Sequence, residues 1–411
     1  MASRLLDLVE DGDRILAATG TGEPRTLLRR LVEEVFPARK NLEVIQVSMG
    51  GEEYLAEAAA EHGHRLRFPV GGRRSERAIS EGRAESFPTT MYQLSTLITS
   101  GQLRIDGALM AGARRNDGTL SPGLSLDVIG AASRAARYRC LEVVSGLPRT
   151  RSVPWLNESD CDLVLEVDEA AAIIADLKPS AVQLTLGHHL AELIEPGATL
   201  ELGVGTGFRG LAPALCDAGV TDIALHTGLI AESSQMLVDR GVVTRFNPCC
   251  KDALIVGGAA RGSQGFYDWL NNNPRVCLAE SSDVHNVAHL VTLPQFMAIN
   301  SASQIDLFGQ VGTPFRHILG SGGLLDFATA GAYSAGSVIA LTARNNRDES
   351  RIVPAVPHVG LSAQLVTHIV TEFGAAHLYG KTLRERADSV IAVAHPEDRS
   401  ALRRAAEQLL C

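Results

Sequence analysis

Aromatic residues are scarce in this chain of 411 residues: they make up 5% of it, and only 2 of them are tryptophan. No run of 18 or more apolar residues occurs, so we expect no membrane-spanning helix. The first 13 residues carry four acids and no apolar core, unlike a secretory signal. The 7 cysteines are odd in number and irregularly spaced, which predicts reduced thiols in a cytoplasmic protein without a cysteine-bound zinc.

Positive charge is also in short supply. The 38 Lys and Arg residues are outnumbered by 47 Asp and Glu residues, giving a net charge of -9, which argues against a broad nucleic-acid-binding surface. A hydrophobic content of 45% and a charged content of 21% are typical of a folded globular protein and exclude disorder as the main state. The 39 glycines, combined with so few aromatic residues, favour α/β layers over a β-sandwich.

Helical and strand-like segments alternate along the chain. In the first half, the predicted helices are 27–36, 54–62 and 127–137, and the predicted strands are 42–47, 107–110 and 140–144. A second cycle has helices at 181–194, 208–218 and 233–240, with strands at 199–202 and 223–226. The alternation predicts an α/β fold with two mostly parallel sheets. We expect domains at 1–180 and 181–411, packed closely around a cleft.

Two glycine-rich turns are candidate anion sites. The first, at 198–210, joins a strand to a helix and contains Gly205-x-Gly207-x-x-Gly210, with Glu232 downstream where a ribose ligand would be expected. The second, Gly320-Ser321-Gly322-Gly323, would expose backbone N–H groups to a phosphate or a developing oxyanion. In both cases the alternative is simply a tight turn.

Other motifs are absent or ambiguous. Neither a G-x-S-x-G elbow nor a phosphate-binding P-loop occurs. His285-x-x-x-His289 has the helical spacing of a metal site, although two partly exposed helix histidines would look the same. Glu280, Asp283 and His285 form either a polar site loop or a helix start capped by Asp283. Adjacent cysteines such as Cys249 and Cys250 are unusual, and we expect them to be small buried apolar residues.

Several long strings together resemble a known family. The strings are INSASQIDLFGQV (299–311), GSGGLLDF (320–327), SRIVP (350–354), VTEFGAAHLYGKTLRERA (370–387), IAVAHPEDR (391–399), FYDWLNNNP (266–274), DGDRI (11–15), RRSERAISEGRAESFPTTM (73–91), DGTLSPGLSLDV (117–128) and LPRT (147–150). In this order, and over nearly the whole chain, they resemble the acetyl-CoA hydrolase / 4-hydroxybutyrate CoA-transferase family. The resemblance implies two open α/β domains of CoA-transferase type, an acyl-CoA site at their interface, a CoA-thioester substrate, and dimers.

The resemblance also implies a glutamate nucleophile that forms an acyl anhydride and then a glutamyl-CoA thioester. That glutamate belongs to an H-T-E-M string, which reads His226-Thr227-Gly228-Leu229 in this chain. Glycine has no side chain, so the covalent route is closed at position 228. The family string G-Q-V-N-A-E has Gly312 in place of its asparagine, and the expected Thr–Thr pair is replaced at 360–363. The two glycine turns, Gln310 and Glu372 are retained.

Loss of the nucleophile leaves three interpretations open. Water or an acceptor could attack the thioester directly, helped by a base and by oxyanion donors at Gly203, Gly205, Gly322 and Gly323. Another side chain could replace the glutamate: Glu232, one turn away if the segment is helical, or Cys249, Cys250 or Glu280. The protein could also bind acyl-CoA without turnover.

The first interpretation is preferred, so the sequence predicts an acyl-CoA transferase or hydrolase with direct attack by water or acceptor. The alternative is a catalytically inactive acyl-CoA-binding or regulatory protein, and a dehydrogenase ranks lower. The candidate catalytic residues are Glu372, Glu232, Gln310 and His226, and the candidate substrate-binding residues are Gly203, Gly205, Gly207, Gly228, Gly320, Gly322 and Gly323. A structural glutamate is the alternative at position 372.

The expected partners are an acyl-CoA and a small-molecule acceptor or water, with no nucleic acid and no membrane. Coenzyme A enters as substrate and product, and we expect no further cofactor and no metal. Arg209, Arg344 and Lys381 are candidates for the CoA phosphates, with ordinary surface charges as the alternative. We expect a homodimer in the cytoplasm.

Overall fold

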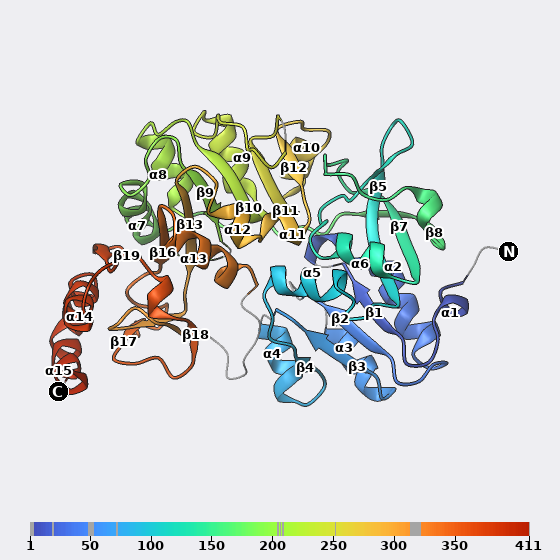
Figure 1. Cartoon of the computed structure of the whole chain (residues 1–411), viewed down its shortest axis with the longest axis horizontal. Helices are drawn as coiled ribbons and strands as arrows, with labels where there is room; N and C mark the ends of the chain where they lie inside the picture. Colours follow the sequence, from blue (N-terminus) through green and yellow to red (C-terminus); the bar gives the residue numbers. More distant parts are fainter. Residues whose placement is uncertain are drawn as a thin grey trace.

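The computed structural model describes residues 4–18, 20–47, 53–70, 73–203, 205, 207, 209–250, 252–312 and 322–410, without the side chains of residues 53–54 and 73–74. Gly320, one of the predicted substrate-binding glycines, lies outside the described residues. Two large sheets dominate the fold, one drawn from each half of the chain (Figure 1). The predicted α/β class with mostly parallel sheets is confirmed.

The first sheet has the strand order β4-β3-β2-β1-β5-β7-β8, with β6 paired to β5. All neighbours on this path are parallel, whereas β5 and β6 are antiparallel. Its strands are β1 (Arg14–Ala17), β2 (Glu43–Gln46), β3 (Arg65–Phe68), β4 (Glu85–Ser86), β5 (Gly107–Arg114), β6 (Leu120–Ser121), β7 (Tyr138–Gly146) and β8 (Leu163–Ala170).

Helices cover both faces of this sheet. They are α1 (Leu5–Leu8), α2 (Arg25–Arg30), which continues as a π-helical turn (Leu31–Val35), α3 (Glu53–Glu61), α4 (Arg73–Ser80), α5 (Met91–Thr99) and α6 (Ile129–Ala135). Alternate residues of β1 enter different cores: Ile15 packs with the α2 leucines, whereas Leu16 packs with Met91 and Ile129 of α5 and α6. Because both faces are buried, these strands read as nearly continuous apolar runs.

The second sheet has the order β12-β11-β10-β9-β13-β16-β19-β20, parallel except for the pair β19–β20. Its strands are β9 (Thr199–Leu202), β10 (Ala224–Ile230), β11 (Ile255–Ala260), β12 (Val276–Leu278), β13 (Phe296–Ser301), β16 (Gly336–Ala340), β19 (His368–Thr371) and β20 (Gly374–His377). The helices of this half are α7 (Ala181–Ala191), α8 (Leu211–Asp217), α9 (Glu232–Asp239), α10 (Gln264–Leu270), α11 (Ser281–Val284), α12 (Val287–Leu290), α13 (Leu324–Ala332), α14 (Leu383–Ala392) and α15 (Arg399–Leu409).

A small third sheet lies beside the second one (Figure 1). It consists of β14 (Gln304–Asp306), β15 (Val311–Gly312), β17 (Ile352–Val353) and β18 (Val359–Leu361) in the order β17-β14-β15-β18. Its apolar residues share a core with α14 and α15, for example Ile305 with Val390 and Leu402. Helix α15 ends close to the C-terminus at the outer end of this half (Figure 1).

One apolar core joins the two halves. Leu124 and Leu126 of the first half are fully buried in the same cluster as Leu200, Leu225 and Ile255 of the second sheet. The halves therefore share a buried interface rather than only a linker. The boundary at residue 180 stays a prediction. Among the described residues, no helix is long and apolar enough to span a membrane.

Candidate active site

The carboxyl end of the second sheet meets a segment of the first half. The N–H groups of Leu126 and Asp127 donate to the Gly258 carbonyl at 3.0 and 3.2 Å, and the Ala260 N–H donates to the Leu124 carbonyl at 2.8 Å. Segment 124–127 therefore continues along the end of β11. In open parallel sheets, ligands bind outside the carboxyl ends of the strands, so this junction is the expected place for a site.

Gly228 lies on β10 at this junction and is partly exposed. A Cβ added to Gly228 would lie 3.3 Å from His285 Cε1 and Phe327 Cε2, and 3.5 Å from His285 Nε2. A Cβ added to Gly323 would lie 2.6 Å from the same His285 Cε1. Two of the predicted substrate-binding glycines therefore border one imidazole, and a side chain at position 228 would start directly beside it.

His285 is almost entirely buried, with 3% of its surface exposed. Burial lowers the pKa of His285 to about 3, and His226 nearby adds to the effect. Its Nδ1 lies 3.7 Å from Asp326 Oδ2 and has no hydrogen-bond partner in the part of the chain that the structure describes. Because the imidazole is neutral at pH 7, this contact is not an ion pair. It is a carboxylate facing an unpaired ring nitrogen.

Asp326 is held by the first half of the chain. The Tyr92 N–H, at the start of α5, donates to Asp326 Oδ2 at 3.2 Å. The Met91 N–H donates to the Gly322 carbonyl at 3.3 Å, so α13 and α5 meet end to end. Burial raises the pKa of Asp326 to about 6, against hydrogen bonds from Thr90, Tyr92 and Met91 that favour the carboxylate. A helix N-terminus also favours a negative charge at this point.

A second polar cluster links the halves beside the first. Arg134 of α6 forms two hydrogen bonds to the buried Glu280 carboxylate, and Ser281 donates its hydroxyl to Asp127. A Cβ at Gly130 would lie 2.6 Å from the Glu280 carboxyl carbon, so glycine leaves the space that Glu280 needs. Glu280, one of the options for replacing the nucleophile, is therefore paired with an arginine.

The segment around His285 differs from the expected helix. Helix α11 begins at Ser281 with Glu280 at its N-cap position, so the prediction that Asp283 caps it is wrong. The chain leaves α11 at His285 and starts α12 only at Val287, capped by the Asn286 side chain. His285 and His289 therefore do not share a helix face, and His285 is buried rather than partly exposed. No group of metal-ligating side chains occurs among the described residues.

His226, a predicted catalytic residue, is fully buried on β10. Its Nε2 donates to the Val284 carbonyl at 3.0 Å, and its Nδ1 faces Asn247 and Cys249, each at 3.4 Å. Burial lowers the pKa of His226 to about 4. Both ring nitrogens are engaged, and His226 holds the backbone of Val284, the residue before His285.

Glu232, also predicted as catalytic, begins α9. Its Oε1 accepts the Ser263 N–H at 3.2 Å, and its Oε2 accepts the Asp176 N–H. The chain between Gly228 and Glu232 is not one helical turn, because β10 runs on to Ile230. The carboxylate binds two backbone amides that tie loop 171–180 to the second half.

Glu372 and Gln310, the other predicted catalytic residues, contact neither Gly228 nor His285 in any described interaction. Glu372 lies in the turn between β19 and β20, where its Oε2 accepts the Ala343 N–H at 2.9 Å. Gln310 lies between β14 and β15, with its side-chain amide donating to Asp306 Oδ2 at 2.7 Å. Their catalytic roles stay predictions.

The turn after β9 is closely packed against its neighbours. A Cβ at Gly203 would lie 2.5 Å from Asn300 Oδ1, and one at Gly207 would lie 2.1 Å from the Ala340 carbonyl oxygen. A Cβ at Gly210 would lie 1.9 Å from the Gln183 carbonyl oxygen, where α7 crosses the start of α8. The Gly203 N–H already donates to the Ile299 carbonyl at 2.9 Å. These contacts explain the glycines by packing, while Gly205 stays a prediction.

The cysteines differ from the expectation of thiols that are all reduced. Cys250 and Cys277 form a disulfide with a Cα–Cα distance of 6.5 Å, a span that suits such a bond. Cys249 keeps its thiol, 2.7 Å from His289 Nε2, and burial raises the pKa of Cys249 to about 12. Neither Cys249 nor Cys250 contacts Gly228 in a described interaction.

The basic residues suggested for the CoA phosphates have other partners. Arg344 pairs with Asp398 at 2.7 Å and with Glu397 at 2.9 Å, and the Lys381 Nζ donates to Ser389 Oγ at 2.8 Å. Arg209 lies in the turn before α8.

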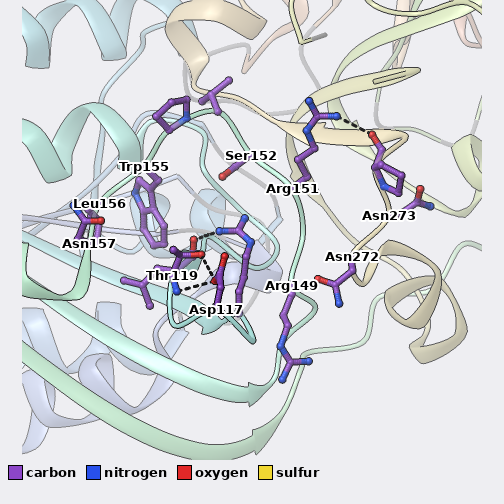
Figure 2. Close-up of a pocket in the computed structure, with 15 residues that line it drawn as sticks. Asp117, Thr119, Arg149, Arg151, Ser152, Trp155, Leu156, Asn157, Asn272 and Asn273 are labelled. Atoms are coloured by element: carbon purple, nitrogen blue, oxygen red, sulfur yellow. Dashed lines mark hydrogen bonds between the residues drawn. The ribbon is translucent and has the colours of Figure 1, made fainter. Parts of the chain in front are cut away.

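A separate pocket of about 690 Å³ lies between the turn before β12 and the segment 149–157 (Figure 2). Arg115, Arg149 and Arg151 line it with a single acid, Asp117. All three arginines donate to backbone carbonyls, Arg115 to Leu120 and Thr150. They brace the loop, and the pocket shares no residue with the site at Gly228.

Two α/β halves that share a core form the fold of the CoA-transferase class, as in the 4-hydroxybutyrate CoA-transferase from Porphyromonas gingivalis (TM-score 0.79), and sequence comparison gives the family. The model of the acetyl-CoA hydrolase/transferase N-terminal domain matches residues 1–183, and that of the C-terminal domain matches residues 262–406. The chain therefore belongs to the acetyl-CoA hydrolase/transferase family, whose members act on CoA thioesters.

Individual relatives agree with this assignment. The 4-hydroxybutyrate coenzyme A transferase of Clostridium kluyveri is 31% identical over 98% of this chain and 95% of its own length. The acetyl-CoA hydrolase of Kluyveromyces lactis is 24% identical over 96% of this chain and 86% of its own. Among solved structures, RipA from Yersinia pestis matches with a TM-score of 0.88 at 24% identity, over 98% of this chain and 95% of that one. At this identity the structural likeness shows the fold.

The sequence predicts only some of the residues that surround Gly228. Gly228 and Gly323 were predicted and lie together. The sequence indicates His285 as a candidate metal ligand or site-loop residue, without a catalytic role. It assigns no role to Asp326, which lies in the string GSGGLLDF. A histidine directly after a short helix is a weak sign of an active site. An acid in the first turn of a helix that follows glycines is equally weak. Their common position emerges only when α11 and α13 meet beside β10.

Proposed function

We propose that this protein is an acyl-CoA hydrolase or acyl transferase in which water or a small acceptor attacks the thioester directly, without a glutamyl-CoA intermediate. The observation that carries the proposal is the glycine at position 228, at the junction of the two halves, in a chain that belongs to a family of CoA-thioester enzymes. A covalent glutamyl route needs a side chain there, and glycine has none.

Stabilisation of the tetrahedral intermediate is assigned to the amides near Gly322 and Gly323. Helix α13 begins at Leu324, and the first N–H groups of a helix have no intrahelical acceptor. Such donors can bind a developing oxyanion. The Gly203 N–H is less suited, because it already donates to the Ile299 carbonyl.

The acyl group is proposed to be small, by analogy with the relatives named for 4-hydroxybutyrate and acetyl-CoA. Coenzyme A would be carrier and product, with no additional cofactor, and the enzyme would act as a cytoplasmic homodimer. The pair His285–Asp326 beside Gly228 and the amides at the start of α13 favour catalysis over the alternative of an inactive acyl-CoA-binding or regulatory protein.

The test is incubation with acetyl-CoA, butyryl-CoA and 4-hydroxybutyryl-CoA, with and without acetate, while thioester loss and free CoA are followed by chromatography. Release of free CoA without acetate supports hydrolysis, whereas conversion of butyryl-CoA to acetyl-CoA only when acetate is present supports transfer. Saturable binding without any loss would support the inactive binder instead. Borohydride added during turnover should not inactivate the enzyme, because no glutamyl thioester forms. Acyl-CoA-dependent inactivation would refute the direct route.

A further inference from the structure

We propose that His285 is the general base that takes the proton from the attacking water, and that Asp326 positions its ring. This inference rests on the proposed function, because direct attack on a thioester requires a base that the family's glutamate would otherwise make unnecessary. Three separate elements meet at this point: the strand β10 at Gly228, the end of α11 at His285 and the first turn of α13 at Asp326.

A side chain at position 228 would start beside the Nε2 nitrogen of His285. The position of a Cβ on Gly228 is 3.5 Å from His285 Nε2 and is bounded on the other side by Phe327 at 3.3 Å. Gly228 itself is partly exposed, whereas the imidazole behind it is buried. A water beyond that position, along the direction that a side chain at position 228 would take, would therefore reach solvent on one side and Nε2 on the other.

The Asp326 carboxylate determines which ring nitrogen of His285 carries the proton. Nδ1 faces Asp326 Oδ2 at 3.7 Å, so a proton on Nδ1 points toward a carboxylate and leaves the Nε2 lone pair free to act as a base. A movement of less than about 1 Å would bring this pair to hydrogen-bond distance. Catalytic hydrogen bonds are often long in the absence of substrate and shorten when it binds.

The proton and electron balance is complete with water alone. The water oxygen bonds to the thioester carbonyl carbon as Nε2 takes one of its protons. The tetrahedral oxyanion collapses, the carbon–sulfur bond breaks, and the imidazolium returns the proton to the CoA thiolate. The products are CoA and a carboxylic acid, which ionises in solution.

The charges around His285 support Asp326 as its partner. His226 of β10 is close enough to affect the pKa of His285, and burial keeps His226 itself neutral by lowering its pKa to about 4. On its own segment, Glu280 is paired with Arg134, and Asp283 is exposed. From the first half, Asp127 accepts the Ser281 hydroxyl. Among the described residues, Asp326 is the acid in contact with Nδ1. A pKa of about 3 is low for a general base, so the proposed role requires the negative charge of Asp326 to stabilise the imidazolium as it forms.

The test uses the full-length variants His285→Gln, His285→Ala and Asp326→Asn, with His289→Gln as a matched control from the same segment. Acyl-CoA binding is measured by calorimetry and thioester loss by chromatography. We expect His285→Gln to lose about 10²–10⁴-fold in kcat, the usual contribution of a general base, with binding retained. Added imidazole should restore part of the rate to His285→Ala. The control should lie within about threefold of wild type.

The pH profile gives a second measurement. Burial raises the pKa of Asp326 to about 6, so the wild-type rate should fall as the pH drops through 6, because the protonated acid no longer accepts the Nδ1 proton. Asp326→Asn should remove this limb and lower the rate over the whole range. If wild type loses no thioester, the proposed function fails. If wild type is active and His285→Gln keeps its rate, or its rate and binding are lost together without imidazole rescue, the role of His285 is refuted.

Discussion

Gly323 and Gly228 border the same imidazole at different distances, and alanine substitutions should therefore separate packing from catalysis. At Gly323, an added Cβ would lie 2.6 Å from His285 Cε1 and 2.7 Å from Phe327 Cε2, distances that no real packing allows. Both rings are buried, so the ring and the helix must shift. Overpacking of this kind costs about 1–3 kcal/mol. The backbone of Gly323, with φ at -84°, adds no strain.

The expected shift in Tm follows from the chain length. At about 2.1 cal/mol/K per residue, unfolding of 411 residues has an entropy of about 0.9 kcal/mol/K. Gly323→Ala should therefore lower the Tm by about 1–3 °C in calorimetry. At Gly228, the nearest contacts are 3.3 Å, so the two buried rings need to move by only a few tenths of an ångström. Gly228→Ala should change the Tm by less than about 1 °C.

The activity of these two variants should not follow their stability. The methyl group of Gly228→Ala would lie 3.5 Å from His285 Nε2 and would narrow the approach of the proposed water to that nitrogen. We expect a loss of at least about tenfold in kcat from this stable variant, measured as thioester loss at saturating acyl-CoA. A Gly228→Ala enzyme with wild-type kcat would refute the placement of the attacking water. Equal Tm values for the two variants would refute the packing argument.

Two further outcomes test groups outside the site. Burial raises the pKa of Glu201 to about 8 from an ordinary 4.5, so its folded form prefers the proton and stability should decline as pH rises from about 4.5 to 8. At about 1.4 kcal/mol per pKa unit, the decline approaches 5 kcal/mol, and Glu201→Gln should remove most of it in urea titrations at pH 5 and 8. The Cys250–Cys277 disulfide predicts that two additional thiols react with maleimide after reduction of the denatured protein. An unchanged count by mass spectrometry would mean that both cysteines are free.

Sequence reasoning was most successful where local pattern and tertiary environment agree. Strand 199–202 was predicted with the bounds of β9, because every residue in it is buried and the glycine turn follows directly. Strand 223–226 was predicted too short, since β10 continues through Gly228 to Ile230. Glycine favours a strand end in a sequence pattern, but pairing with β11 on one side keeps the chain extended.

The site itself required contacts between distant segments. His285 and Asp326 are 41 positions apart, and Tyr92 of α5 reaches Asp326 from the other half of the chain. No spacing rule connects such residues. The same limit applies to Glu232, whose partners Asp176 and Ser263 lie in different loops. The glycine patterns indicate where the backbone packs closely against its neighbours. They do not indicate that Gly228 and Gly323 border the imidazole of His285.

Introducing a glutamate at position 228 tests whether Gly228 lies beside the reacting carbonyl carbon of the thioester. In Gly228→Glu, the side chain would start from a Cβ 3.3 Å from His285 and Phe327, so both rings must shift slightly to admit it. We expect an acyl-CoA-dependent loss of activity on borohydride treatment, with the reduced residue mapped to position 228, and transfer of CoA to acetate. Gly228→Gln, of the same size without a nucleophilic carboxylate, should show neither. If Gly228→Glu folds and binds acyl-CoA but is never trapped, position 228 lies away from the thioester, and the direct-attack route loses its structural basis.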